Sequence, residues 1–296
     1  SRGLGDVYKR QVAIHGDRVV HVGKRRWVLK ALKQEMTAHG TIHERHWDGV
    51  LTPGLINAHT HLQYSGMVQV GQGTYDRFRA WELAFNEVYA EAQKTQPWKQ
   101  WAEDGARQMV ESGTTAAADI VTDLDAAGAL ASQGMHGIAY WEVMGWHNAE
   151  WMEKGRTELI RQLRRMNEEQ LPNLGISPHA PYTLESEPFV DLPDIARQLN
   201  MRLHIHLAET PLEAGTYPPV LTTYSAADWS DHDWESYRQL KEVGKGASAI
   251  QFVDQLGSLG PDVHIAHGVW ANGEDRRILR QRGVGVALCP RSNRIT

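Results

Sequence analysis

The chain has 296 residues, of which 41% are hydrophobic and 23% are charged, a composition that excludes a disordered or collagen-like protein. With 31 basic and 36 acidic residues, the formal net charge is -5, and no lysine- and arginine-rich run predicts a nucleic-acid partner. The single cysteine, Cys289, excludes an internal disulfide framework. No apolar run is long enough to span a bilayer and no secretory signal is visible at the start, so we expect a cytoplasmic protein with no membrane partner.

The first fifty residues predict a small β-domain. Residues 1–11 show neither alternation nor helical periodicity, and we interpret them as a non-native scar outside the fold. From Val12 to Gly23 hydrophobic residues alternate around a Gly16-Asp17 turn, which predicts a β-hairpin. Short, polar, strand-sized pieces continue to about Gly49. We therefore assign residues 12–50 to part of a small β-sandwich domain.

After Pro53, short apolar runs alternate with helical patterns, which indicates repeated βα units and a parallel sheet. The predicted strands are Leu55–His61, Thr114–Val121, Gly137–Val143, Leu174–Ser177, Arg202–Leu207, Val263–His267 and Val284–Cys289. Residues 51–296 are therefore predicted to form an α/β fold, a (β/α)8 TIM barrel truncated before strand eight. An open doubly wound sheet is the alternative, although no G-x-G-x-x-G follows a strand to support its dinucleotide-binding form.

One long stretch interrupts the alternation of strands and helices. Residues Thr210–Lys245 contain Pro218-Pro219 and several aspartates and tryptophans. Two interpretations stay open, a solvated surface insertion and a lid over the mouth of the active site.

Histidines collect at the ends of the predicted strands. His59 and His61 are two residues apart at the end of the first strand, so their side chains share one face. His179, His206 and His267 end or directly follow three later strands. In a barrel these ends form the active-site face. Two imidazoles from one strand suit Zn²⁺ or Fe²⁺, so the pattern predicts a metal site.

Three other residues with metal-binding side chains receive structural interpretations. His204 and His264 lie deeper in their strands, where a histidine satisfied within the core is expected. Cys289 is interpreted as a small apolar strand residue, because no neighbouring group in the sequence would make it a nucleophile.

Five segments in order resemble the aminohydrolase/chlorohydrolase, or cytosine deaminase-like, branch of the amidohydrolase superfamily. They are Pro53–His61, Ser177–Thr183, His206–Thr210, His267–Trp270 and Cys289–Asn293. The branch includes S-adenosylhomocysteine and methylthioadenosine deaminases, aminodeoxyfutalosine deaminases and triazine hydrolases. The resemblance runs from about Val12 to Asn293 and is specific for the branch, not for a substrate.

The resemblance implies one divalent metal ion, with zinc favoured and iron as the alternative. His59, His61 and His206 match the three histidine ligands, whereas the family's strand-eight aspartate has no counterpart in this chain. Binuclear relatives bridge two metals with a carboxylated lysine, and no predicted strand contains a lysine. Glu142 is the one candidate for a second site, and we expect it to be structural.

The expected metal ion indicates a hydrolytic reaction, because a bound divalent metal lowers the pKa of water to about 7 and makes hydroxide available as the nucleophile. Glu209, three residues after His206, is expected to carry the water proton to the departing nitrogen. His267 is expected to polarise either the metal-bound hydroxide or the attacked ring carbon and to stabilise the tetrahedral adduct. By resemblance, His179 contacts the substrate ring.

The remaining predicted substrate contacts follow from position in the chain. Gln63 and Tyr64 come directly after the H-x-H pair and are expected to reach over the substrate. Trp81 falls where some deaminases of the branch place an aromatic ring, although ordinary helix packing stays open. Asn293, in the loop after the last strand, is expected at the mouth of the site.

The predicted function is hydrolytic deamination of an amino-substituted N-heterocycle or nucleoside derivative, with metal-bound hydroxide attacking a ring carbon and ammonia leaving. A chlorohydrolase or cyclic amide hydrolase with the same metal site is one alternative, and an inactive fragment or metal-binding relative is another. Because no eighth strand follows, we expect this polypeptide to be inactive or nearly so, with strand edges that promote aggregation. The expected partner is a small heterocyclic substrate, and a homo-oligomer is implied by resemblance alone.

Overall fold

The computed structural model describes residues 10–36, 40–76, 78–168, 171, 173–215, 237–238, 240 and 242–294. The chain divides into two compact units, residues 1–52 and 53–296. Most of the stretch interpreted above as an insertion or a lid, residues 216–236, lies outside the described residues, as do residues 1–9. Neither interpretation of that stretch is therefore tested.

The smaller unit contains the predicted hairpin. Strands β1 (Arg10–His15) and β2 (Arg18–Lys24) pair antiparallel, with Val12 opposite Val22. Gly16 in the turn has a φ of 61°, a left-handed conformation that glycine adopts without strain. Arg10 and Gln11 form the first pairs of the ladder. Placing these two residues in a segment outside the fold is therefore wrong, because they belong to β1.

The segment after the hairpin differs from the prediction of strand-sized pieces. It forms helix α1 (Arg25–Glu35), in which Val28 is buried. Leucine, lysine, alanine, glutamine and glutamate dominate its sequence, and all have high helix propensity. Val28, Ala31 and Leu32 recur at the three- and four-residue spacing of one helix face, a signal that the prediction of strand-sized pieces did not take into account.

The larger unit is built on a parallel seven-stranded sheet in the simple order β3-β4-β5-β6-β7-β8-β9. The strands are β3 (Leu55–Thr60), β4 (Thr114–Val121), β5 (His136–Val143), β6 (Leu174–Pro178), β7 (Arg202–Leu207), β8 (Val263–His267) and β9 (Gly285–Ala287). Sequential parallel neighbours with helical connections are the topology of a (β/α) barrel. The prediction of a TIM-barrel-like fold with seven strands is confirmed.

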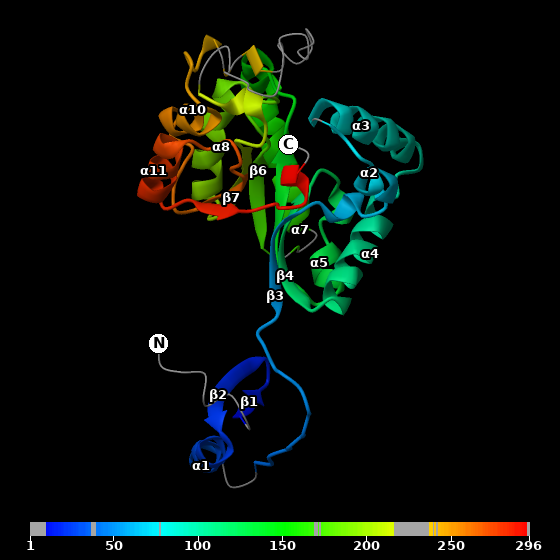
Figure 1. Ribbon diagram of the computed structural model, residues 1–296, viewed down its shortest axis with the longest axis vertical. Helices are drawn as coiled ribbons and strands as arrows, with labels where there is room; N and C mark the ends of the chain where they lie inside the picture. Colours follow the sequence, from blue (N-terminus) through cyan, green and yellow to red (C-terminus); the bar gives the residue numbers. More distant parts are fainter. Residues whose placement is uncertain are drawn as a thin grey trace. The chain divides into compact units, whose positions relative to one another are not determined.

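Helices surround this sheet (Figure 1). They are α2 (Val68–Gln72), α3 (Phe78–Thr95), α4 (Trp98–Glu111), α5 (Ala129–Ser132), α6 (Asn148–Glu150), α7 (Arg156–Glu168), α8 (Ser186–Gln198), α10 (Ala249–Gln255) and α11 (Gly273–Arg282). Shorter helical turns are η1 (Leu62–Tyr64), η2 (Leu124–Ala126), η3 (Trp151–Gly155), η4 (Pro211–Glu213) and η6 (Ser292–Arg294). Within the described ranges, no helix combines the length and apolar character that crossing a bilayer requires.

The main core lies between the strands and the helices that follow them. Ile176, Leu203 and Ile205 in the strands pack in one buried cluster with Leu192 and Ile195 of α8. Burying side chains of this size stabilises the fold by about 1.5–3 kcal/mol each relative to exposure. The packed strands therefore present their carboxyl ends as a fixed platform for polar side chains.

The two edge strands of the sheet are β3 and β9. Leu55 and Ile56 in β3 and Val286 in β9 are exposed. In central strands of the same sheet, residues such as Ile205 and Ile265 are fully buried. The apolar surface that the sheet exposes is therefore found at its two edges.

Candidate active site

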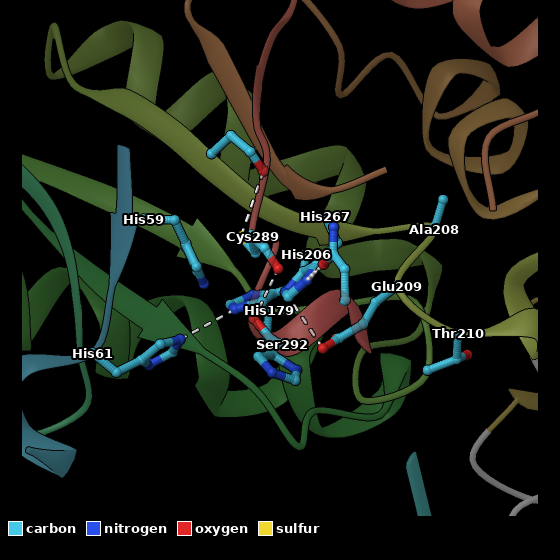
Figure 2. A network of polar contacts seen from close by, with 12 residues as sticks. His59, His61, His179, His206, Ala208, Glu209, Thr210, His267, Cys289 and Ser292 are labelled. Atoms are coloured by element: carbon cyan, nitrogen blue, oxygen red, sulfur yellow. Dashed lines mark hydrogen bonds and ion pairs between the residues drawn. The ribbon is translucent and has the colours of Figure 1, made fainter. Parts of the chain in front are cut away.

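Histidines from three strands converge at the carboxyl end of the sheet (Figure 2). His59 and His61 come from β3 and its end, His206 from β7, and His267 from the end of β8. Nε2 of His61 lies 3.2 Å from Nε2 of His206, and the rings of His59 and His206 are 4.8 Å apart. Side chains 145 residues apart in the sequence thus face one another, as predicted from the strand ends.

The three imidazoles fit a single metal ion. His59, His61 and His206 each offer a nitrogen, and these nitrogens lie within 4.8 Å of one another. Two nitrogens bound tetrahedrally to zinc at about 2.0–2.1 Å would be separated by roughly 3.3 Å. The 3.2 Å between the Nε2 atoms of His61 and His206 is close to that value. Three imidazole donors with room for a further ligand are the set that Zn²⁺ or Fe²⁺ prefers.

The protonation state of these histidines also suits a metal. Burial, together with the neighbouring His267 and His179, lowers the pKa of His59 to about 3. Burial likewise holds the pKa of His61 and of His206 well below the usual value, and adjacent imidazoles act in the same direction. A metal ligand must be a neutral imidazole, so the ligands need lose no proton at neutral pH.

Two further groups of possible ligands surround the same point. They are His59, His267 and Cys289, and Glu142, His179 and His206. Each shares a histidine with the three-imidazole set, so neither is independent of it. The three-imidazole set remains the arrangement that matches the predicted ligands.

His204 is not merely a core residue. Its Nε2 lies 3.0 Å from Nδ1 of His59, which leaves Nε2 of His59 for a metal. His204 is fully buried, and its Nδ1 has no hydrogen-bond partner in the described part of the chain. His264, by contrast, is exposed rather than buried, because it pairs with the edge strand β9. The core interpretation is therefore wrong for His264.

Glu209 and His267 lie side by side above the imidazoles. Oε1 of Glu209 is 3.4 Å from Nε2 of His267, and both side chains are buried. The hydroxyl of Tyr182 donates a hydrogen bond to Oε2 of Glu209 at 3.0 Å. Nδ1 of His267 lies 3.1 Å from Oδ1 of Asn293, which fixes the plane of the ring. A carboxyl group and an imidazole are thus presented together at hydrogen-bonding distance from a shared space.

His179 and Glu142 form the floor of the site. Oε1 of Glu142 is buried without a hydrogen-bond partner among the described residues, and it lies 3.8 Å from Nδ1 of His206 and 4.0 Å from Nε2 of His179. Burial, together with the nearby Glu209, raises the pKa of Glu142 to about 8. Thr183 contacts Nδ1 of His179 at 2.8 Å and so orients the ring. Glu142 therefore lies close to a predicted ligand and lines the cavity.

These side chains open into a cavity of about 640 Å³. Its floor contains His59, His61, His179, His206, Glu209 and His267. Its walls include Tyr64, Phe78, Trp81, Phe85, Tyr182 and Tyr237. A mostly aromatic wall above a few convergent polar groups is typical of a site for a small, flat molecule. Tyr64 and Trp81, two of the predicted substrate contacts, line this cavity.

Two predicted substrate contacts lie elsewhere. Gln63 is only 1% exposed and does not line the cavity; its amide accepts from the backbone N–H of Thr122 at 2.8 Å and donates to the Thr122 hydroxyl. Asn293 contacts His267 and is absent from the cavity wall, where its neighbour Ser292 lies instead. The substrate-contact prediction is therefore corrected for both, since each side chain is used to hold a neighbouring element of the site.

No sequence motif singles out several other residues of the site. Tyr237 lies within the Thr210–Lys245 stretch, and Phe78 and Phe85 lie on the same face of α3 as Trp81. Phe78, Trp81 and Phe85 are spaced three and four residues apart, a pattern that equally predicts ordinary core packing. Only the neighbouring strand ends make this face part of a cavity.

The sequence model of the amidohydrolase family matches residues 50–217, which are more than half of the chain. The 5-methylthioadenosine/S-adenosylhomocysteine deaminase of Thermococcus kodakarensis is 30% identical over 294 residues, covering 97% of this chain and 60% of the relative. The chain therefore spans about 60% of the length of that relative.

Solved structures show the same fold. An adenosine deaminase from Xanthomonas campestris with bound zinc has a TM-score of 0.67 at 20% identity, covering 97% of this chain and 59% of its own. A mutant of atrazine chlorohydrolase from Arthrobacter aurescens, complexed with zinc and atraton, has a TM-score of 0.68 at 17% identity, covering 94% of this chain and 60% of its own. With the matched family model and the histidines at the strand ends, these findings show that the chain belongs to the amidohydrolase family.

Proposed function

We propose that this protein is a metal-dependent hydrolytic deaminase of an amino-substituted N-heterocycle, with adenosine-type nucleosides as its substrate class. The supporting observation is the carboxyl group of Glu209, held beside His267 and facing the same cavity as three metal-suited imidazoles. The names of the relative and of one structural neighbour, both deaminases of adenosine-type compounds, support the substrate class.

The proposed ligands are His59, His61 and His206, and zinc is the proposed ion. The bound zinc in two structural neighbours supports that choice, as does the all-imidazole donor set. When bound, the ion supplies a water acidic enough to act as a nucleophile at neutral pH. The side chains around the site are proposed to transfer the proton, stabilise charge and bind the substrate.

Glu209 is proposed to move the proton. In the reaction a C–O bond forms at the ring carbon, the C–N bond to the amino group breaks, and the nitrogen leaves as ammonia. Glu209 accepts a proton from the attacking water and delivers it to the departing nitrogen. Tyr182 donates to the other carboxyl oxygen at 3.0 Å, which orients the group without occupying the oxygen nearest His267. His267 stabilises the charge that develops on the adduct.

The heterocycle is proposed to lie between the aromatic wall and the floor of the cavity. Tyr64 and Trp81 offer ring faces against which a planar base can stack, and His179 lies at the floor to contact the ring edge. A cavity of about 640 Å³ is within the range of ligand sites that hold drug-sized molecules. It is therefore large enough for a base that carries a sugar.

The test is ammonia release by the full-length, zinc-loaded protein from adenosine, 5-methylthioadenosine, S-adenosylhomocysteine, guanine and cytosine. We expect turnover of at least one adenosine-type nucleoside and its loss when zinc is removed by a chelator. Absence of turnover with every compound would contradict the proposal.

A chlorohydrolase with the same metal site is the second candidate, supported by the structural likeness to atrazine chlorohydrolase. It needs no change in the ligands, only a different leaving group on the heterocycle. Chloride release from atrazine without ammonia release from nucleosides would favour it. Ring opening of a cyclic amide without ammonia would instead indicate a cyclic amide hydrolase.

A further inference from the structure

A second glutamate lies four residues after Glu209 and is completely buried. Glu213 ends the helical turn η4, and its side chain has an exposed fraction of 0%. Oε1 accepts a hydrogen bond from the backbone N–H of Ala208 at 2.9 Å. Oε2 accepts from the N–H of Glu209 at 2.8 Å and from that of Thr210 at 2.9 Å. One carboxyl group thus binds three consecutive amides, and the middle one is that of Glu209.

The backbone at these amides is unusual. Ala208 directly follows strand β7 and has a φ of 53°, in the left-handed region that side chains other than glycine rarely adopt. Such a conformation costs of order 1–3 kcal/mol and persists only where its surroundings determine it. It turns the chain sharply at the strand end, so that Glu209 projects toward the histidines (Figure 2).

Two other contacts hold the same turn. The carbonyl of Ala208 accepts from the N–H of Trp270 at 2.9 Å, and the hydroxyl of Thr210 lies 2.9 Å from that of Tyr237. These contacts restrain the two ends of the turn, whereas the backbone N–H of Glu209 is bound by Glu213. Glu213 itself does not line the cavity, so it has no route to the substrate.

We propose that Glu213 is a positioning residue for the reaction, which fixes the turn at residues 208–210 and thereby holds the Glu209 carboxyl group in place. The inference rests on the proposed function, because it takes Glu209 as the group that moves the proton. It assigns Glu213 no contact with reacting atoms. A misplacement of about 1 Å in a reacting group can lower the rate about 100-fold, so small displacements of this turn matter.

The chemistry explains why a carboxyl group suits the position. When the group is ionised both of its oxygens are acceptors, and here each receives at least one N–H. Glutamine has the same shape but carries one oxygen and one NH₂ group. In Glu213→Gln the NH₂ group would therefore face a backbone N–H, and two donors would oppose each other. Burial and the nearby Glu209 raise the pKa of Glu213 to about 8 against the backbone N–H groups, which favour the ionised form, so the group is ionised above about pH 8. Comparisons between variants are therefore made at one fixed pH.

A matched control is available in helix α11 of the same unit. Asp275 is also fully buried and accepts hydrogen bonds from the backbone N–H of Asn272 at 2.9 Å and from the Ser248 hydroxyl at 2.6 Å. It caps helix α11 and does not line the cavity. Asp275→Asn therefore makes the same chemical change, a buried carboxyl group to an amide, without touching the Glu209 turn.

The experiment compares full-length zinc-loaded wild type, Glu213→Gln, Glu213→Asp and Asp275→Asn by kcat, KM, zinc content and amide hydrogen exchange. For Glu213→Gln we expect kcat to fall about 10- to 100-fold, with KM and zinc content unchanged within about twofold. We also expect exchange at residues 208–210 to accelerate by about tenfold or more. For Asp275→Asn we expect a lower unfolding temperature with kcat unchanged within about twofold.

The outcomes distinguish a failure of the inference about Glu213 from a failure of the proposed function. A Glu213→Gln protein whose kcat stays within about twofold of wild type, or whose 208–210 amides exchange as in wild type, overturns the inference. If wild type releases no ammonia, the proposed function fails, while hydrogen exchange still decides whether Glu213 fixes the turn. Should Glu213→Gln fail to fold, Glu213→Asp decides: its shorter carboxyl group should restore folding but leave kcat reduced, and wild-type kcat in that variant overturns the inference.

Discussion

Nδ1 of His59 lies 3.0 Å from Nε2 of His204, a buried histidine two residues before His206 in strand β7. The contact fixes which nitrogen of His59 faces the proposed metal. Partners of this kind orient metal-binding histidines, and their loss lowers metal affinity about 10- to 100-fold. His204 therefore has a role that extends beyond packing.

Replacing His204 with phenylalanine should weaken zinc binding about 10- to 100-fold, because the ring volume is kept while the contact to His59 is lost. Zinc affinity can be measured by competition with a chromophoric chelator. His264→Phe is the control, since His264 is exposed and contacts the ring of His204 but is not bonded to His59. Wild-type affinity in His204→Phe would show that the contact does not support the metal site.

Glu209→Gln should lower kcat for ammonia release by a factor of about 100 to 10,000, the usual contribution of a general acid–base group. Zinc content should not change, because Glu209 is not among the proposed ligands. Glu274→Gln serves as the control: Glu274 pairs with Arg277 on the exposed surface of α11. A Glu209→Gln protein with more than a tenth of the wild-type kcat would remove Glu209 from the proposed mechanism.

Tyr182→Phe should lower kcat about tenfold. The Tyr182 hydroxyl donates to Oε2 of Glu209 at 3.0 Å, and a hydrogen bond to a charged group is worth about 1.5–3 kcal/mol. Tyr75→Phe is a suitable control, because the Tyr75 hydroxyl bonds to the Val70 carbonyl and does not line the cavity. Equal kcat values for the two variants would contradict a role for Tyr182 in orienting Glu209.

The metal-free protein should be most stable near pH 6.5. On the acid side, burial depresses the pKa of His59 to about 3 and of His179 to about 4. Below about pH 6.5 the unfolded chain binds protons at these histidines that the folded chain does not, so stability falls with falling pH. Each such histidine contributes up to about 1.4 kcal/mol per pH unit.

On the alkaline side, burial raises the pKa of three carboxyl groups to about 8, those of Asp119, Glu142 and Glu213. Between about pH 4.5 and 8 the folded chain holds protons there that the unfolded chain releases, so this contribution to stability is lost as pH rises. Below pH 6.5 the histidines, which include His61, His204 and His206, outnumber these acids. Urea unfolding at pH 5.5, 6.5 and 8 in a chelator checks the maximum, and stability that rises steadily to pH 8 would contradict it.

The pattern of strands in the sequence was sufficient to predict most of the fold of the larger unit and most of the histidine cluster. Period-two spacing placed His59 and His61 on one face, and the strand ends brought His206 and His267 to the same edge of the sheet. These are local patterns, and parallel strands convert local positions into spatial neighbours. The prediction of strands after the hairpin was wrong for helix α1, although Val28, Ala31 and Leu32 have the spacing of a helix face.

The errors concern side chains whose partners lie far away in the sequence. Gln63 is held by Thr122 and Asn293 by His267, contacts that no local spacing shows. His264 was expected inside the core, but its neighbour β9 is an edge strand. Glu213 carried a local signal that was not used, since Thr210 and Glu213 form a capping box three residues apart.

The central claim is that His59, His61 and His206 bind one metal ion. Crystals of the zinc-loaded protein, measured with X-rays tuned to the zinc edge, test it most directly. The account predicts one strong anomalous peak about 2.0–2.1 Å from a nitrogen of each histidine. A zinc peak bound by other residues, or none in crystals grown with excess zinc, would contradict it.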